Sequence, residues 1–195
     1  MKTMKKSTVR TITIFVIIIA CIIGYYAYLS GRSRDSEEDS KMTTVQLVLS
    51  RDLEKDYPPT VKEVIKYYAD IQKCFYNEEC TDEEVEQLGL KARELYDAEL
   101  LENNEVNNNL LQLKADIATF RSDEKQIGTV AVASSVNVDT FTEDGYDFAR
   151  IQCTYSVIQG GKSNLVPTVY LLRRDEDRRW KIYGWDLAQN VDPAD

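Results

Sequence analysis

The chain has 195 residues and a formal net charge of −9, with 24 basic and 33 acidic side chains. Residues 1–34 hold six of the basic residues and no acidic one, so the rest of the chain sets 18 basic residues against 33 acidic ones. Such an acidic domain repels phosphate backbones, which argues against nucleic acid as a partner. The absence of histidine excludes Ser-His and Cys-His catalytic pairs and removes the most common metal ligand. We find no catalytic motif, and we expect neither a cofactor nor a metal.

The apolar segment 12–29 predicts a membrane anchor. It contains 18 uncharged residues, equivalent to about 27 Å of helix, which is close to the hydrocarbon thickness of a bilayer. Four basic residues precede it and the acidic run 35–39 follows it, so the positive-inside bias places residues 1–11 in the cytoplasm. We expect an uncleaved signal anchor and a single-pass cell-membrane protein whose C-terminal domain lies outside.

Two alternatives for this segment stay open. Residues 18–21, Ile-Ile-Ala-Cys, are similar to a lipobox, in which case Cys21 carries a lipid in place of a retained span. Against this, the apolar run continues for eight residues after Cys21. Cleavage of a signal peptide near residues 27–31 is the other alternative.

The remaining sequence predicts one domain on a tether. Residues 30–43 are polar and rich in charge and serine, which is typical of a flexible linker. Residues 44–195 are enough for one extracytoplasmic domain with its own core.

Apolar residues at helical spacing predict three to four helices in the first half of this domain. A short helix must end before Pro58, and the next begins at residue 59 or 60. A capping box at Thr81 starts the third helix, whose apolar stripe extends to Tyr96 and which ends near residue 103. The fourth covers about residues 107–122.

After residue 123 the apolar period changes to two, which predicts about four antiparallel strands. We expect them around residues 130–138, 149–157, 166–174 and 180–187. Asp144-Gly145 suits a hairpin turn between the first two. Helices followed by consecutive strands indicate an α+β domain, with the helices packed on a curved antiparallel sheet.

Two resemblances follow from these patterns. The helical half followed by strands that end in residues 179–185, RWKIYGW, resembles the nuclear transport factor 2-like fold, in which a curved sheet wraps a long helix. This likeness implies a cone-shaped domain whose mouth, in some members, holds an acid and a tyrosine; Asp147, Tyr155 and Tyr170 are the corresponding candidates. Residues 49–60, 74–79 and 92–97 resemble an uncharacterised family of small membrane-anchored clostridial proteins, which implies a Gram-positive cell surface and no known activity.

Aromatic rings are the candidates for a pocket. The set that could line one is Tyr68, Phe75, Tyr155, Tyr170 and Trp185. Tyrosines at alternating strand positions also pack in ordinary cores with bonded hydroxyls, and that alternative stays open.

Basic residues near the last turn form a candidate partner surface, which we call the arginine cluster: Arg173, Arg174, Arg178 and Arg179. The alternative is that they pair with the acidic run 175–177 across the hairpin.

The cysteines of the domain have two possible states. Cys74 and Cys80 are either reduced or bridged to each other.

The sequence therefore favours a non-enzymatic interaction or assembly module held at the membrane, with a protein partner or self-association. A small-ligand-binding or isomerase-like pocket domain is the alternative.

Overall fold

The computed structural model describes residues 42–190. The expected cytoplasmic tail, the apolar segment with Cys21 and nearly all of the linker lie outside these residues. Within residues 42–190, no helix has the length and apolar character needed to cross a membrane.

The described residues form five α-helices, each begun by a side chain that caps its first turn. Thr43 and Thr81 both make capping boxes, as the sequence predicts for Thr81, and Thr60 accepts a hydrogen bond from the Glu63 amide. The five helices are α2 (Thr44–Leu49), α3 (Val61–Asn77), α4 (Asp82–Arg93), α5 (Ala98–Asn103) and α6 (Val106–Ser122).

The expected third helix is in fact two helices. α4 ends at Arg93, and the chain then extends so that Tyr96 pairs in parallel with Ile182. The Ile182 amide donates to the Leu95 carbonyl and the Asp97 amide donates to the Ile182 carbonyl, both at 2.8 Å. These long-range backbone bonds outweigh the local helical pattern, because they satisfy groups at the edge of the last strand.

The second half forms one antiparallel sheet of five strands: β1 (Gln126–Val132), β2 (Asp139–Glu143), β3 (Tyr146–Gln159), β4 (Lys162–Arg174) and β5 (Trp180–Leu187). The order is β1-β3-β4-β5, and β2 also pairs with β3. Because β4 occupies one edge of β3, β1 and β2 follow each other along the opposite edge.

The expected first strand is therefore wrong in one respect. A 3-10 turn at Ser135–Asn137 divides it into β1 and β2. Val136, which the alternating pattern assigned to the strand, is 89% exposed in that turn. The hairpin after β2 is as expected, since Asp144 and Gly145 both have positive φ.

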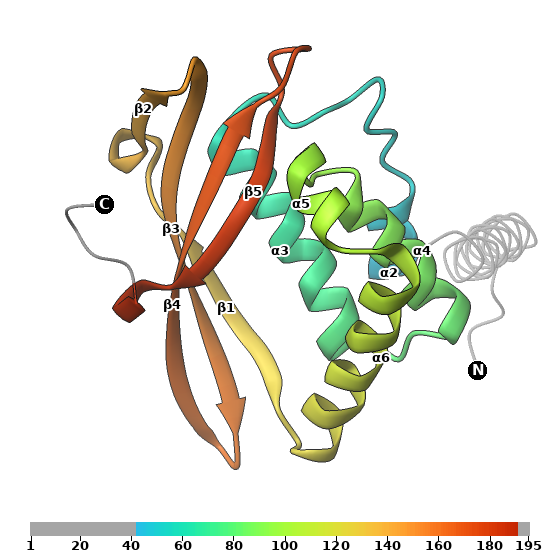
Figure 1. Cartoon of the computed structure of the whole chain (residues 1–195). Coiled ribbons are helices and arrows are strands. Elements are labelled where there is room, and N and C mark those ends of the chain that lie inside the picture. The colour runs from blue at the N-terminus through green and yellow to red at the C-terminus, as the bar shows by residue number, and fades with distance from the viewer. Residues whose placement is uncertain (1–41, 191–195) are drawn as a thin grey trace, which may run out of the picture. The chain divides into compact units, whose positions relative to one another are not determined.

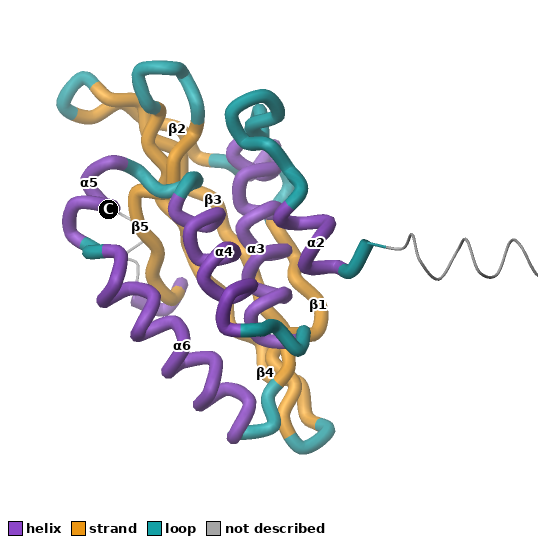
Figure 2. The backbone as a smooth tube through the Cα atoms, turned by 90° about the vertical axis from the view of Figure 1, so that its right-hand side faces the viewer, coloured by secondary structure: helices purple, strands orange, loops and turns teal. Residues whose placement is uncertain are grey.

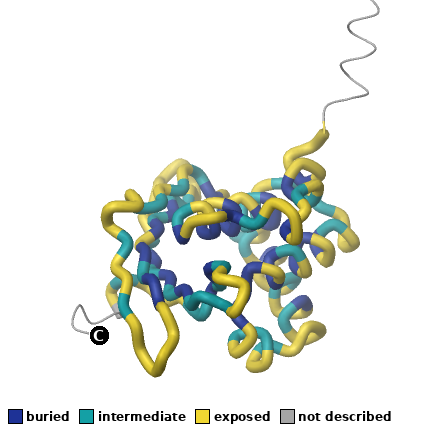
Figure 3. The backbone as a smooth tube through the Cα atoms, turned by 90° about the horizontal axis from the view of Figure 1, so that it is seen from above, coloured by how far each residue is buried: buried dark blue, intermediate teal, exposed yellow. Residues whose placement is uncertain are grey.

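The core lies between the sheet and α3, and all the labelled helices lie on one face of the sheet (Figure 1). Figure 2 shows this helical layer in front of the strands, with α6 running diagonally to one side of α3 and α4. Buried residues gather between the two layers (Figure 3), among them Ile65 and Ile71 from α3 and Leu172 and Ile182 from the sheet. Each such side chain contributes about 1.5–3 kcal/mol through burial.

The described cysteines are free thiols, so Cys74 and Cys80 are not bridged in this structure. The Cys80 thiol donates to the Cys74 carbonyl at 3.4 Å. Burial raises the pKa of the Cys74 thiol to about 12, so it stays protonated and packs as a small apolar group.

Candidate functional site

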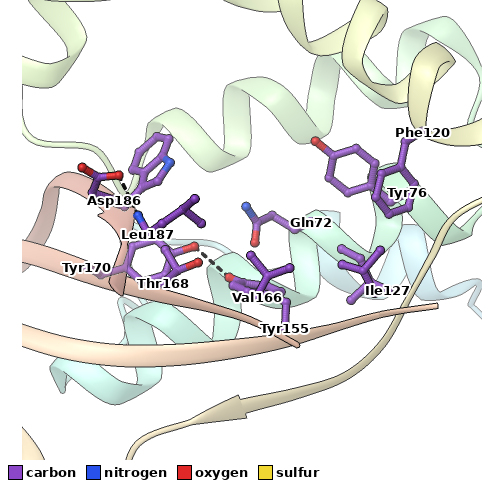
Figure 4. Close-up of a pocket in the computed structure, with 12 residues that line it drawn as sticks. Gln72, Tyr76, Phe120, Ile127, Tyr155, Val166, Thr168, Tyr170, Asp186 and Leu187 are labelled. Carbon is purple, nitrogen blue, oxygen red and sulfur yellow. Dashed lines mark hydrogen bonds between the residues drawn. The ribbon is translucent and has the colours of Figure 1, made fainter. Parts of the chain in front are cut away.

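A pocket of about 430 Å³ lies on the helix-covered face of the sheet, beside α3. Helices α3 and α6 supply Gln72, Tyr76 and Phe120, and the strands supply the floor. Figure 4 shows Tyr76, Phe120 and Ile127 at one end, Asp186 and Leu187 at the other, and Gln72 between them. The strand residues that line the pocket are Ile127, Tyr155, Val157, Val166, Thr168, Tyr170, Trp185, Asp186 and Leu187.

Gln72 is the polar centre of this pocket. Its side-chain oxygen Oε1 is buried and has no hydrogen-bond partner among residues 42–190. A buried acceptor without a donor costs about 1–3 kcal/mol, and most buried polar groups in proteins are satisfied. Gln72 Oε1 is therefore a buried acceptor that lacks a donor, on a side chain that lines the pocket.

The floor of the pocket carries a pair of tyrosine hydroxyls. The hydroxyls of Tyr155 and Tyr170 lie 2.8 Å apart and share one hydrogen bond. Burial raises the pKa of both hydroxyls well above the usual value, so both stay neutral at physiological pH. The Tyr155 hydroxyl also contacts the Cys153 side chain, and this hydrogen bond contributes to the pKa shifts of both groups.

Four aromatic rings surround one end of the pocket. The ring centroids of Tyr68, Tyr96 and Tyr170 lie 6.0, 5.8 and 6.2 Å from the ring centroid of Trp185. The Tyr68 and Tyr96 hydroxyls lie 3.0 Å apart, which fixes two of these rings. Trp185 itself is 46% exposed, so it offers an aromatic surface that the protein leaves open.

A second cavity of about 340 Å³ lies between α3, α4, α5 and α6. It shares Gln72, Tyr76 and Trp185 with the first pocket. These three residues therefore form a junction at which the two cavities meet. Asp116 of α6 lines the second cavity, and its carboxylate adds to burial in raising the pKa of Tyr76.

The structure brings the predicted aromatic set to these two cavities. Tyr155, Tyr170 and Trp185 line the first, and Tyr68, Phe75 and Trp185 line the second. Sequence reasoning missed Gln72. The signal that could have identified it is its spacing of four from both Tyr68 and Tyr76, which places it on the aromatic face of α3.

Asp147, the acid that the fold resemblance implied, does not join the two tyrosines. It lies on the β2–β3 hairpin, where Thr142 donates to it at 3.1 Å and its side chain is 54% exposed. Its position two residues from the Asp144-Gly145 turn explains the difference, because hairpin tips project beyond the core. The structure thus separates the acid and the tyrosines of the implied isomerase-like site.

Arg173, the first member of the arginine cluster, is occupied within the molecule. Its guanidinium makes two hydrogen bonds to the Asp97 carboxylate, one of them from Nε at 3.0 Å, and one to Glu99 at 3.1 Å. It also lies over the rings of Tyr146 and Tyr183. Arg173 therefore links the α4–α5 connection to the sheet.

Two other arginines of the cluster also have internal contacts. Arg174 lies over the Trp180 ring and 3.8 Å from Asp147. Arg179 donates to the Glu54 carbonyl at 3.1 Å and lies over Tyr57. Within residues 42–190 these arginines make no ion pair with the run 175–177; instead the Arg179 amide donates to the Asp175 carboxylate, and the Arg178 amide donates to the Asp175 carbonyl. Arg178 is exposed at a positive-φ position, and its side chain has no hydrogen bond or ion pair with any residue of the range 42–190.

The fold and the pocket together define an α+β domain with helices on one face of an antiparallel sheet and an aromatic cavity between the layers. The chain belongs to the family described as a domain of unknown function, DUF6715, whose model matches residues 1–185. This confirms that the family is an uncharacterised one. No curated protein matches the chain.

Proposed function

We propose that this protein is a membrane-anchored, extracytoplasmic binding domain that holds a small, mostly apolar ligand in the pocket beside α3. The observation that carries the proposal is the buried, unpartnered Oε1 of Gln72 at the centre of an aromatic cavity. A cavity of about 430 Å³ falls within the range of small-molecule sites, which are typically apolar with a few placed polar groups.

The anchoring part of the proposal rests on the uncharged segment 12–29 and on the basic residues before it. The proposed setting is a Gram-positive, clostridial cell surface. The order of elements and the helix-covered sheet also support a nuclear transport factor 2-like fold. In that fold a curved sheet wraps a long helix, and the pocket of this chain lies between α3 and the sheet.

The geometry gives more support to ligand binding than to a docking role for the arginine cluster. Arg173, Arg174 and Arg179 already contact carboxylates, carbonyls or rings of the same chain. We propose binding without catalysis, because Asp147 lies at a hairpin away from Tyr155 and Tyr170.

A matched pair of tryptophan substitutions tests the proposal. Val166 lines the pocket, whereas its neighbour Leu165 is 70% exposed and is not among the residues that line it. The full-length chain and the variants Val166→Trp and Leu165→Trp would be purified from the membranes of the native host. Organic extracts would then be compared by mass spectrometry.

We expect a small molecule to accompany the unsubstituted chain and Leu165→Trp, and to be lost from Val166→Trp because the new ring fills the cavity. A compound recovered equally with all three chains would contradict the proposal. So would the recovery of no compound from any of them.

A further inference from the structure

We propose that the ligand is a protonated amine with an apolar body, and that its ammonium group sits between Gln72 and Trp185, on the side of the junction away from Tyr76. This inference rests on the proposed function, because it names the class of ligand for the same pocket. Three independent features of the two cavities support it: their charge, their rings and their free acceptor.

The first feature is charge. Among the described residues that line either cavity there is no lysine or arginine, whereas each cavity is lined by one aspartate, Asp186 in the first and Asp116 in the second. The domain around them is strongly acidic. A negative potential of this kind attracts cations and repels carboxylates and phosphates. Anionic ligands, including fatty acids, are therefore disfavoured.

The second feature is the aromatic surface at the junction. Trp185 belongs to both cavities and is open to solvent on part of its surface. The rings of Tyr68, Tyr96 and Tyr170 pack against it, with centroids 5.8–6.2 Å from the Trp185 centroid. Tryptophan is the best aromatic partner for a cation, and the interaction strengthens when the cation is desolvated. A neutral apolar ligand would gain contact with these rings but not this electrostatic attraction.

The third feature is the acceptor. Gln72 Oε1 needs a donor, and an ammonium group carries up to three N–H donors and no acceptor. Hydrogen bonds from charged donors contribute more than neutral ones. The remaining length of the first pocket, from Tyr76 and Phe120 to Val166, suits an apolar body (Figure 4).

The test uses three molecules of nearly equal shape that differ in charge. Tyramine is the cation, 4-propylphenol replaces its ammonium with a methyl group, and 3-(4-hydroxyphenyl)propanoate supplies an anion. Binding to the full-length chain in lipid nanodiscs would be followed by tryptophan fluorescence. Trp185 reports on the junction, and the buried Trp180 gives a constant background.

We expect tyramine to bind about tenfold more tightly than 4-propylphenol, as a desolvated cation–aromatic contact allows, and the anion to show no saturable change. Gln72→Leu should weaken tyramine about tenfold and leave 4-propylphenol nearly unchanged. Gln152→Leu, an exposed position outside both cavities, is the control and should change neither.

The possible outcomes separate this inference from the proposed function. Equal binding of the cation and the neutral molecule, or preference for the anion, would overturn the ligand class and leave the pocket as a binding site. Binding of none of the three molecules would overturn the ligand class. The mass-spectrometric comparison of Val166→Trp with Leu165→Trp would then decide whether the pocket binds any ligand.

Discussion

Arg173 and the pocket beside α3 are both polar features of the same domain, but they differ in how their polar groups are satisfied. Arg173 makes hydrogen bonds to two carboxylates and lies over two rings. Gln72 Oε1 is buried and has no hydrogen-bond partner within the described part of the chain. A satisfied polar group holds the fold together, whereas an unsatisfied one lowers stability and persists where a ligand can complete it. The comparison therefore gives Arg173 a structural role and supports the proposal that the pocket binds a ligand.

The largest effect should come from removing the carboxylate that pairs with Arg173. Asp97 is 3% exposed, pairs with Arg173 and caps α5 by accepting from the Glu99 amide. Asp97→Ala should lower the free energy of unfolding by about 3 kcal/mol, because it leaves the guanidinium without its main partner and removes a cap. Urea denaturation of the full-length chain, followed by tryptophan fluorescence, measures this loss.

Asp147→Ala is the matched control for that experiment. The Asp147–Arg174 pair is longer, at 3.8 Å, and solvent reaches both side chains. Its removal should cost less than about 1 kcal/mol. Equal losses for the two aspartates would refute the structural role given to Arg173.

The second effect tests the hydroxyl pair on the pocket floor. Tyr155→Phe or Tyr170→Phe alone should lower the free energy of unfolding by about 1–2 kcal/mol, since each removes the partner of a buried hydroxyl. The double variant should lose much less than the sum of the two, because no hydroxyl is then left unpaired. Urea denaturation of the four chains of this cycle gives the coupling, and simple additivity would show that the hydroxyls do not act as a pair.

The third effect has the opposite sign. Gln72→Leu should raise the free energy of unfolding of the ligand-free chain by about 1 kcal/mol, because it removes an unpaired buried acceptor. Gln152→Leu, on the exposed side of β3, should stay within about 0.5 kcal/mol. Thermal denaturation of the two variants in parallel would reveal the difference, and a loss of stability in Gln72→Leu would mean that its oxygen has a partner within the fold.

The smallest effect concerns the exposed member of the arginine cluster. Arg178→Ala should change the free energy of unfolding by less than about 0.5 kcal/mol, since the side chain is exposed at the β4–β5 turn. The same urea experiment measures it. A loss comparable with that of Asp97→Ala would show that the cluster acts as one unit.

Features that depend on neighbouring residues were predictable from the sequence. The capping box at Thr81 and the hairpin turn at Asp144-Gly145 were both found as expected. Each depends on local hydrogen bonds or on local dihedral preferences, so a short stretch of sequence contains the whole cause. The aromatic set was also found, because helical and strand periodicity places these rings on inward faces.

Features that depend on distant residues were missed. The end of α4 at Arg93 is caused by pairing with Ile182, and the division of the first strand is caused by its register along β3. The partner of Arg173 is Asp97, 76 residues away, rather than the adjacent acidic run. Spacing along the chain contains none of these pairings. For the same reason, sequence alone could show that Gln72 lies on an aromatic face, but not that its oxygen is unpaired.

The pairing of Tyr96 with Ile182 has a consequence for how the chain folds. It joins the middle of the helical half to the last strand, so this contact forms only after nearly the whole domain has been made. Contacts between such distant residues slow folding, because the intervening loop must close first. Until β5 has been synthesised, the backbone groups of Asp97 and its neighbours lack their hydrogen-bond partners in that strand. A nascent chain that stops short of residue 182 should therefore remain open to proteases, and the domain should acquire its protection in one late step.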